Sequence, residues 1–368
     1  MIYSLLFILW DTVPEIWPNS SIPVRWYGLF FAAAFFLGQI LITKIFKAEG
    51  KSESDVDALT YYMIAATVIG ARLGHCLFYQ PDYYLSNPIE ILKIWEGGLA
   101  SHGATVGIIV AMWLYSRKRP DQSWLWILDR IVIVVALGGS FIRMGNLMNS
   151  EIVGKPSDLP WSMIFVNPFE TRVLAMEEDR IEKFQIVKAE GDTLIAGQKY
   201  YPLNLDFVFG RDKMEGSSVQ AFIYSTIPNA VEASNGDEKH IFFDPTIAQA
   251  REGFSEDGKR TLRIRAFGLP RHPAMVYEAI SNFILFILLY MIWDKKRAQL
   301  PEGRLFALFV VLLFTIRFFY EFLKENQVSF ESDLPLNMGQ FLSIPMVLAG
   351  ILLLIRTYKK PPEISGKI

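Results

Sequence analysis

The sequence predicts an all-α polytopic membrane protein with about seven transmembrane helices and an inserted, β-rich extracytoplasmic domain. Hydrophobic residues make up 52% of the 368 residues and charged residues only 20%, so the chain is more apolar than an ordinary soluble domain. Apolar runs near the roughly 20 residues that cross a bilayer recur along the chain. One long segment of mixed composition interrupts them, which predicts the inserted domain.

The apolar runs are the predicted spans, at residues 26–45, 59–78, 99–116, 124–143, 275–293, 305–323 and 338–355. An earlier apolar run, residues 2–10, lacks a basic flank and a small-residue cleavage site, so we do not expect a removable signal. Trp10, Trp17 and Trp26 lie in or near it. Tryptophan is enriched where membrane meets water, so this run is interpreted as an interfacial segment.

Basic residues in the short loops predict the orientation. They cluster in every odd loop and in the tail, at Lys44, Lys47, Lys51, Arg117, Lys118, Arg119, Lys295, Lys296, Arg297, Arg304, Arg356, Lys359 and Lys360. The even loops have only Lys93 and Lys324. Since cytoplasmic loops carry the excess of Lys and Arg, we expect the C-terminus inside and the N-terminus outside.

Three parts follow from these spans: residues 1–145 with spans one to four, residues 146–272 as the extracytoplasmic insertion, and residues 273–368 with spans five to seven and a cytoplasmic tail. Short β-type runs at 184–187, 203–209 and 261–264 predict strands in the insertion, and 235–239 has the composition of a loop. The sequence does not indicate what segment 155–265 does.

Composition excludes several classes. The net charge of −2 gives no basic field for nucleic acid. Cys76 is the single cysteine, so the chain has no internal disulfide and no CxxC metal site. No glycine-rich phosphate loop, HExxH or GxSxG motif occurs.

Ionisable residues inside predicted spans are costly unless they have a role. For Asp129 and Arg130, near the cytoplasmic end of a span, structural ion pairs are at least as good an explanation as function. For His102, Arg143 and Arg317 we favour function, because all fall in the outer half of the membrane on the predicted topology. Glu321 also falls in the outer half. It lies four residues after Arg317, so the two side chains would share a helix face.

The fourth span ends in an unusual stretch, Ser140 to Gly154, with Arg143, Asn146, Asn149 and Glu151 beside two glycines. So many hydrogen-bonding groups at the end of an apolar run predict one wall of an active site at a membrane surface.

These residues resemble the prolipoprotein diacylglyceryl transferases, bacterial inner-membrane enzymes. The resemblance rests on blocks in the family's order over all seven spans: Arg25-Trp26-Tyr27-Gly28, Gly98 to Gly103, Arg143 to Gly154, Arg271-His272-Pro273 to Glu278, Arg317-Phe318, Glu321-Phe322, Met338-Gly339-Gln340 and Ser343 to Met346. The chain departs from the family's usual residues at Ile142, Leu147, Ala104 and Leu313.

The resemblance implies transfer of the diacylglyceryl group of phosphatidylglycerol to the lipobox cysteine of a prolipoprotein, with no metal or cofactor. The catalytic candidates are His102, Arg143 and Arg317. His102 would act as a base for the thiol or position it, and the two arginines would bind the phosphate. The substrate-binding candidates are Tyr27, Gly98, Asn146, Glu151, Gly154 and Glu321. His272 and Glu278 are secondary candidates, and for His272 an interfacial capping role is the stronger interpretation.

Three other classes remain open from the residues alone. A transporter would also place polar groups at depth, although no internal repeat is found. A phospholipid hydrolase would use water in place of the thiol. A membrane anchor for the outer domain would leave Arg143, Arg317 and Glu321 without a role.

Overall fold

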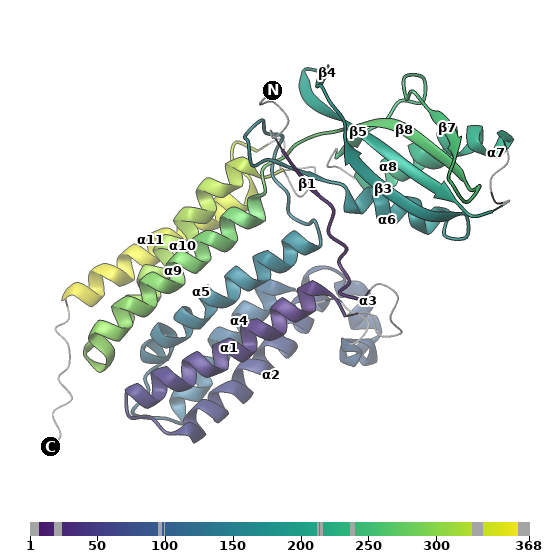
Figure 1. The fold of residues 1–368 in the computed structure, drawn as a ribbon. Coiled ribbons are helices and arrows are strands. Elements are labelled where there is room, and N and C mark those ends of the chain that lie inside the picture. The colour runs from purple at the N-terminus through teal and green to yellow at the C-terminus, as the bar shows by residue number, and fades with distance from the viewer. Residues whose placement is uncertain are drawn as a thin grey trace. The chain divides into compact units, whose positions relative to one another are not determined.

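The computed structural model describes residues 7–17, 24–94, 98, 100–211, 213, 216–235, 240–325 and 334–359 (Figure 1). Of the predicted features, residues 2–6 of the N-terminal run, 236–239 of the loop, Gly97 and Leu99 lie outside these ranges. The chain forms two units. The helical unit comprises residues 31–142, 279–318 and 338–368, and the mixed unit comprises residues 1–30, 143–278 and 319–337.

All or most of each of the following helices belongs to the helical unit: α1 (Trp26–Ala48), α2 (Glu53–Phe78), α3 (Pro81–Ser86), α4 (Ser101–Arg117), α5 (Trp124–Met148), α9 (Ala274–Lys296), α10 (Arg304–Tyr320) and α11 (Met338–Lys359), with 3₁₀ turns at Pro88–Leu92 and Arg297–Gln299. Within the described residues, α1, α2, α5, α9, α10 and α11 are long and apolar enough to cross a membrane. The chain is therefore a mostly helical, multi-pass membrane protein. The helix at the third predicted span, α4, has 17 residues, so a seventh crossing stays a prediction.

Glycines explain how closely α4 approaches α2, its neighbour in Figure 1. Gly70 and Gly74 on α2 face Gly103 and Gly107 on α4. A Cβ on Gly74 would lie 2.6 Å from the Cα of Gly103, and a Cβ on Gly107 would lie 2.6 Å from the carbonyl oxygen of Ala66. Small residues four apart let the backbones of membrane helices pack directly on each other. This packing fixes the helix on which His102 lies.

Asp129 and Arg130 have structural roles. Both are fully buried. The Asp129 carboxylate accepts hydrogen bonds from the backbone amides of Gly303, at 2.7 Å, and Phe306, at 2.8 Å, and so caps the start of α10. Arg130 forms an ion pair with Glu49, with 2.7 Å between Nη2 and Oε2. These contacts support the structural explanation over the functional one.

The mixed unit contains β1 (Ile8–Trp10), β2 (Met163–Phe165), α6 (Asn167–Met176), β3 (Ile181–Lys188), β4 (Thr193–Ile195), β5 (Gln198–Phe209), α7 (Gly216–Ala221), a π-helical turn (Phe222–Thr226), α8 (Ile227–Asn235), β6 (Ile241–Phe242), β7 (Arg251–Phe254), β8 (Arg260–Gly268) and a 3₁₀ turn (Glu321–Leu323). The main sheet is antiparallel, in the order β3-β5-β8-β6, with β4 paired to β5 and β7 paired to β8. The three predicted β-runs lie in β3, β5 and β8. Helices accompany the strands, so the segment is a mixture of α and β structure.

The sheet has one apolar face and one polar face. Along β8, Leu262, Ile264 and Ala266 are buried and belong to a core that includes Phe169 and Val173 of α6. The residues between them on β8, Arg263 and Arg265, point to the opposite face because side chains alternate along a strand. In Figure 1, α6 and α8 lie on one side of this sheet.

The predicted interfacial run forms a strand. Ile8–Trp10 pairs in parallel with Met163–Phe165, and the indole nitrogen of Trp10 donates to the carbonyl oxygen of Leu147, at 3.0 Å. Hydropathy alone did not predict this pairing, because it depends on a partner about 150 residues away. The location of the run at a membrane interface stays a prediction.

Candidate active site

Arg143 lies in the next-to-last turn of α5, and two neighbouring side chains hold its guanidinium. Its Nε lies 2.5 Å from Oε2 of Glu278, and its Nη1 donates to Oδ1 of Asn146, at 3.2 Å. Arg143 and Asn146 are three residues apart on α5, so they share a helix face. The side chain is 24% exposed. A partly exposed guanidinium that protein groups hold at two of its nitrogens is suited to contact an oxyanion through its remaining N–H groups.

Glu278 links Arg143 to a second cation. Its Oε1 lies 2.5 Å from the ammonium of Lys324, which in turn lies 3.2 Å from Oε1 of Glu321. Asn337 donates to Oε2 of Glu321, at 3.1 Å. Glu278, Glu321 and Lys324 are all less than 10% exposed. Two cations and two carboxylates therefore form one buried network, in which each charge has an opposite charge beside it.

The Glu151 carboxylate is held by two amides. Asn146 donates to its Oε2, at 2.9 Å, and Asn149 donates to its Oε1, at 3.1 Å. The flanking residues Ser150 and Ile152 have φ angles of 55° and 58°. This left-handed region is costly for a β-branched residue, and such strain clusters at functional sites. The strained turn presents Glu151 beside Asn146, and Asn146 contacts Arg143.

Tyr27 lies against the backbone of α5 at Gly145. A Cβ on Gly145 would lie 2.8 Å from Cδ2 of the tyrosine ring and 3.3 Å from its Cα. Glycine is therefore needed at this point of the motif for the tyrosine to reach the helix. Gly145 is two residues from Arg143 and one from Asn146, so the contact places Tyr27 beside the Arg143 motif.

Gly154 lies where three chain segments meet. Its amide donates to the carbonyl oxygen of His272, at 2.9 Å, and its own carbonyl oxygen accepts from Arg271, at 3.1 Å. A Cβ at this position would lie 2.7 Å from the carbonyl oxygens of both His272 and Leu323. Gly154 was predicted to bind substrate, and that stays a prediction. Its surroundings give it a packing role that holds Leu323, and thus Lys324, next to the Arg143 motif.

His272 and Tyr277 form a polar cluster at the start of α9. The Nδ1 atom of His272 lies 3.3 Å from the Tyr277 hydroxyl, which also accepts a hydrogen bond from the indole of Trp161, at 2.8 Å. Burial lowers the pKa of His272, because desolvation disfavours the imidazolium form. Burial therefore favours the neutral form of His272.

The other three candidates belong to the helical unit. His102 is the second residue of α4, is exposed, and packs edge-on against the ring of Phe78, with 5.0 Å between ring centroids. Arg317 lies in the last turn of α10. Gly98 has a φ of 69°, and a Cβ there would lie 2.6 Å from the His75 ring. Eight of the eleven candidates thus lie in the mixed unit, and their convergence with His102 and Arg317 stays a prediction.

Sequence reasoning missed the role of two residues. It treated Lys324 as an isolated loop lysine, yet this residue is 3% exposed and joins Glu278 to Glu321. The three-residue spacing of Glu321 and Lys324 was the available signal. Tyr277 was noticed only as part of the resemblance, and its contact with His272 depends on how α9 begins. Among the described residues, no group of three or more His, Cys, Asp or Glu side chains forms a candidate metal site.

Comparisons with known proteins agree on one family. Residues 14–356 match the family model described as prolipoprotein diacylglyceryl transferase. A relative from Chloroherpeton thalassium is 36% identical over 357 residues, which cover 96% of both chains. Relatives from Tolumonas auensis and Porphyromonas gingivalis are each 33% identical and cover 96% of this chain, and 98% and 96% of their own lengths. All three are named phosphatidylglycerol–prolipoprotein diacylglyceryl transferase. The chain belongs to the prolipoprotein diacylglyceryl transferase family.

Proposed function

We propose that this enzyme transfers the diacylglyceryl group of phosphatidylglycerol to the lipobox cysteine of a prolipoprotein in the bacterial inner membrane. The product is a thioether, and glycerol phosphate leaves. The family match over nearly the whole chain and the names of its relatives support this activity. The single structural observation that carries it is the partly exposed Arg143 guanidinium, which Glu278 and Asn146 hold at its Nε and Nη1 atoms.

The reaction requires an electrostatic aid of this kind. The cysteine sulfur, as thiolate, forms a C–S bond to the glyceryl carbon next to the phosphate, and the C–O bond from that carbon to the phosphate breaks. The thiol proton goes to a base. The phosphodiester begins with one negative charge and leaves as a phosphate monoester with two, so charge develops on its oxygens. Fixed cationic donors at that point stabilise the transition state more than the ground state.

The candidates have distinct roles in this scheme. Arg143 and Arg317 bind the phosphate, and His102 takes the thiol proton or positions the thiol. Tyr27, Gly98, Asn146, Glu151 and Glu321 hold the headgroup and orient the arginines. Glu278 positions Arg143 directly. Gly154 and His272 hold together, through their backbone hydrogen bond, the chain segments next to the Arg143 motif.

The predicted topology is part of the proposal. We place the N-terminus and residues 146–272 outside the cytoplasmic membrane and the C-terminus inside, with α4 as the seventh crossing. The basic loops support this orientation. The domain division at residues 145/146 and 272/273 goes with it. In this arrangement Arg143, at the outer end of α5, faces the leaflet from which a secreted prolipoprotein is reached.

The test incubates the purified protein with phosphatidylglycerol and a peptide that contains a lipobox cysteine. We expect a mass increase of one diacylglyceryl group on the peptide and stoichiometric release of glycerol phosphate. A peptide with Ser in place of the cysteine is the matched control, because it keeps the shape but lacks the thiolate.

The same assay separates the alternatives. Consumption of phosphatidylglycerol with release of diacylglycerol and no peptide modification would identify a hydrolase and overturn the proposal. No change in either substrate, with protein that remains folded, would overturn it as well.

A further inference from the structure

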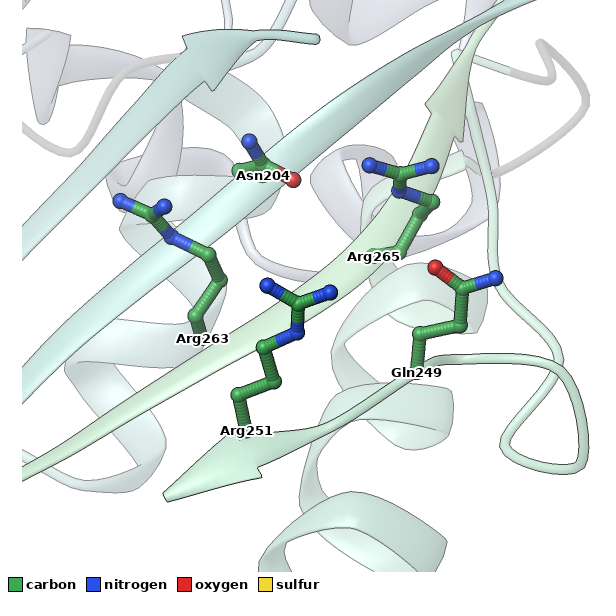
Figure 2. A pocket seen from close by; sticks show the side chains of 5 residues that line it. All are labelled: Asn204, Gln249, Arg251, Arg263 and Arg265. Atoms are coloured by element: carbon green, nitrogen blue, oxygen red, sulfur yellow. The ribbon is translucent and has the colours of Figure 1, made fainter. Parts of the chain in front are cut away.

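Three arginines share the polar face of the main sheet. Arg263 and Arg265 lie on β8, and Arg251 lies on the neighbouring edge strand β7. Arg251 is the direct cross-strand partner of Arg263, and Asn204 of β5 is the partner of Arg265. Figure 2 shows these side chains on the same face of the sheet. None of them is among the catalytic or substrate-binding candidates.

The pairing of Arg251 with Arg263 is unfavourable for the sheet. Like charges on directly opposite residues of an antiparallel pair destabilise it. The only carboxylate among the described residues that pairs with these arginines is Asp206, whose oxygens accept from Arg263 at 2.6 and 2.8 Å. Neither Arg251 nor Arg265 has an ion-pair partner within the described ranges. The face therefore carries two arginines more than its fold neutralises, and a local conflict of this kind indicates a binding role.

A small depression lies between these groups. It has a volume of about 80 Å³ and is lined by Asn204, Gln249, Arg251, Arg263 and Arg265. A single water needs only roughly 10–15 Å³, so the space admits a small oxyanion. The lining offers guanidinium and amide N–H donors and no carboxylate. Gln249 has a φ of 44°, so the loop before β7 is held in a costly conformation at the rim.

We propose that this depression, the arginine face, binds an oxyanion of the phosphate class. Arg251 and Arg265 supply the unneutralised charge, Arg263 is the third guanidinium, and Asn204 and Gln249 supply neutral donors. Clusters of arginines recognise phosphate because the planar guanidinium matches two of its oxygens at once. The phosphate belongs either to a soluble phosphate ester or to a lipid headgroup. The proposal is independent of the transfer reaction, because it uses none of the residues assigned to it.

The test follows hydrogen exchange of residues 251–254 and 260–268 in the full-length protein, because that signal is local to β7 and β8. One arm adds glycerol phosphate to the protein in neutral detergent. The other compares nanodiscs of phosphatidylcholine with nanodiscs that contain phosphatidylglycerol. Protection in the first arm identifies a soluble ester as sufficient, and protection in the second arm alone identifies a lipid headgroup.

Arg265→Gln is the informative variant, since it removes one unpaired charge and puts a neutral amide donor in place of the guanidinium. We expect the ligand concentration that gives half-maximal protection to rise about tenfold, as for the loss of one charged hydrogen bond. Arg172→Gln is the matched control. Arg172 is exposed on α6, which covers the opposite face of the sheet. Absence of protection by either ligand in the wild-type protein, or an equal loss in the control, would overturn the proposal.

Discussion

Arg143 offers the sharpest test of the proposed active site. Two replacements separate its charge from its shape. Arg143→Ala removes the guanidinium completely, whereas Arg143→Lys keeps a positive charge but cannot bind two phosphate oxygens in a fork. Both leave Asn146 with its contact to Glu151, at 2.9 Å, so the strained turn keeps one of its supports.

The structure gives the expected size of each effect. In either variant Glu278 retains Lys324, 2.5 Å away, so the buried carboxylate is not left unpaired. We therefore expect a stability loss of about 1.5–3 kcal/mol, the value of one charged hydrogen bond. Loss of a fixed donor to a developing oxyanion costs about 10²–10³ in rate. Arg143→Ala should lose at least that much transfer, and Arg143→Lys about tenfold, because its charge remains.

The assay measures the initial rate of diacylglyceryl transfer to a lipobox peptide, together with thermal unfolding in detergent. Arg172→Gln serves as the control for loss of a positive charge from the mixed unit, and we expect it to behave as wild type. If Arg143→Ala is folded and its rate stays within about threefold of wild type, Arg143 does not bind the phosphate in the transition state, and our assignment is wrong.

Three further predictions address other parts of the molecule. His102→Asn should lower transfer at pH 7 by about 10² or more if His102 is a general base, whereas activity that recovers toward wild type as pH rises would assign it to positioning. Gly154→Ala should destabilise the protein by about 1–3 kcal/mol through overpacking, measured by thermal unfolding against Gly28→Ala, where an added Cβ meets no atom within 4 Å. Burial, together with a hydrogen bond and the charge of Asp11, raises the pKa of Glu170 to about 8. The folded state then binds this proton more tightly than the unfolded chain, so stability should fall as pH rises from 6.5 to 8, and Glu170→Gln should flatten that dependence; an unchanged slope in the variant would contradict this.

The helical part of the fold was predictable because each span carries its own signal. A run of about 20 apolar residues has to be a helix in a membrane, where no other unclosed structure satisfies its backbone. Each predicted span overlaps a helix for this reason. The contact between Arg143 and Asn146 was predictable in the same way, since residues three apart on one helix are neighbours.

Features that depend on contacts between distant segments were not predictable. The strand at Ile8–Trp10 exists because Met163–Phe165 lies beside it. Gly154 is a glycine because the chain returns at His272 and again at Leu323. Both facts follow from how the chain crosses itself, and no local pattern of hydropathy or spacing records such a crossing.

Lys324 shows what the network adds to the chemistry. In the proposed complex with phosphate, the Arg143 guanidinium shares its charge between that phosphate and Glu278. A buried carboxylate left without a cation would be strongly destabilised. Glu278 avoids this because Lys324 lies 2.5 Å from its other oxygen, and Glu321 has Asn337 as a second partner in addition to Lys324. Under this proposal, the pairing of Glu278 with two cations lets Arg143 contact the phosphate without leaving a buried carboxylate unpaired, and it gives the buried lysine a role.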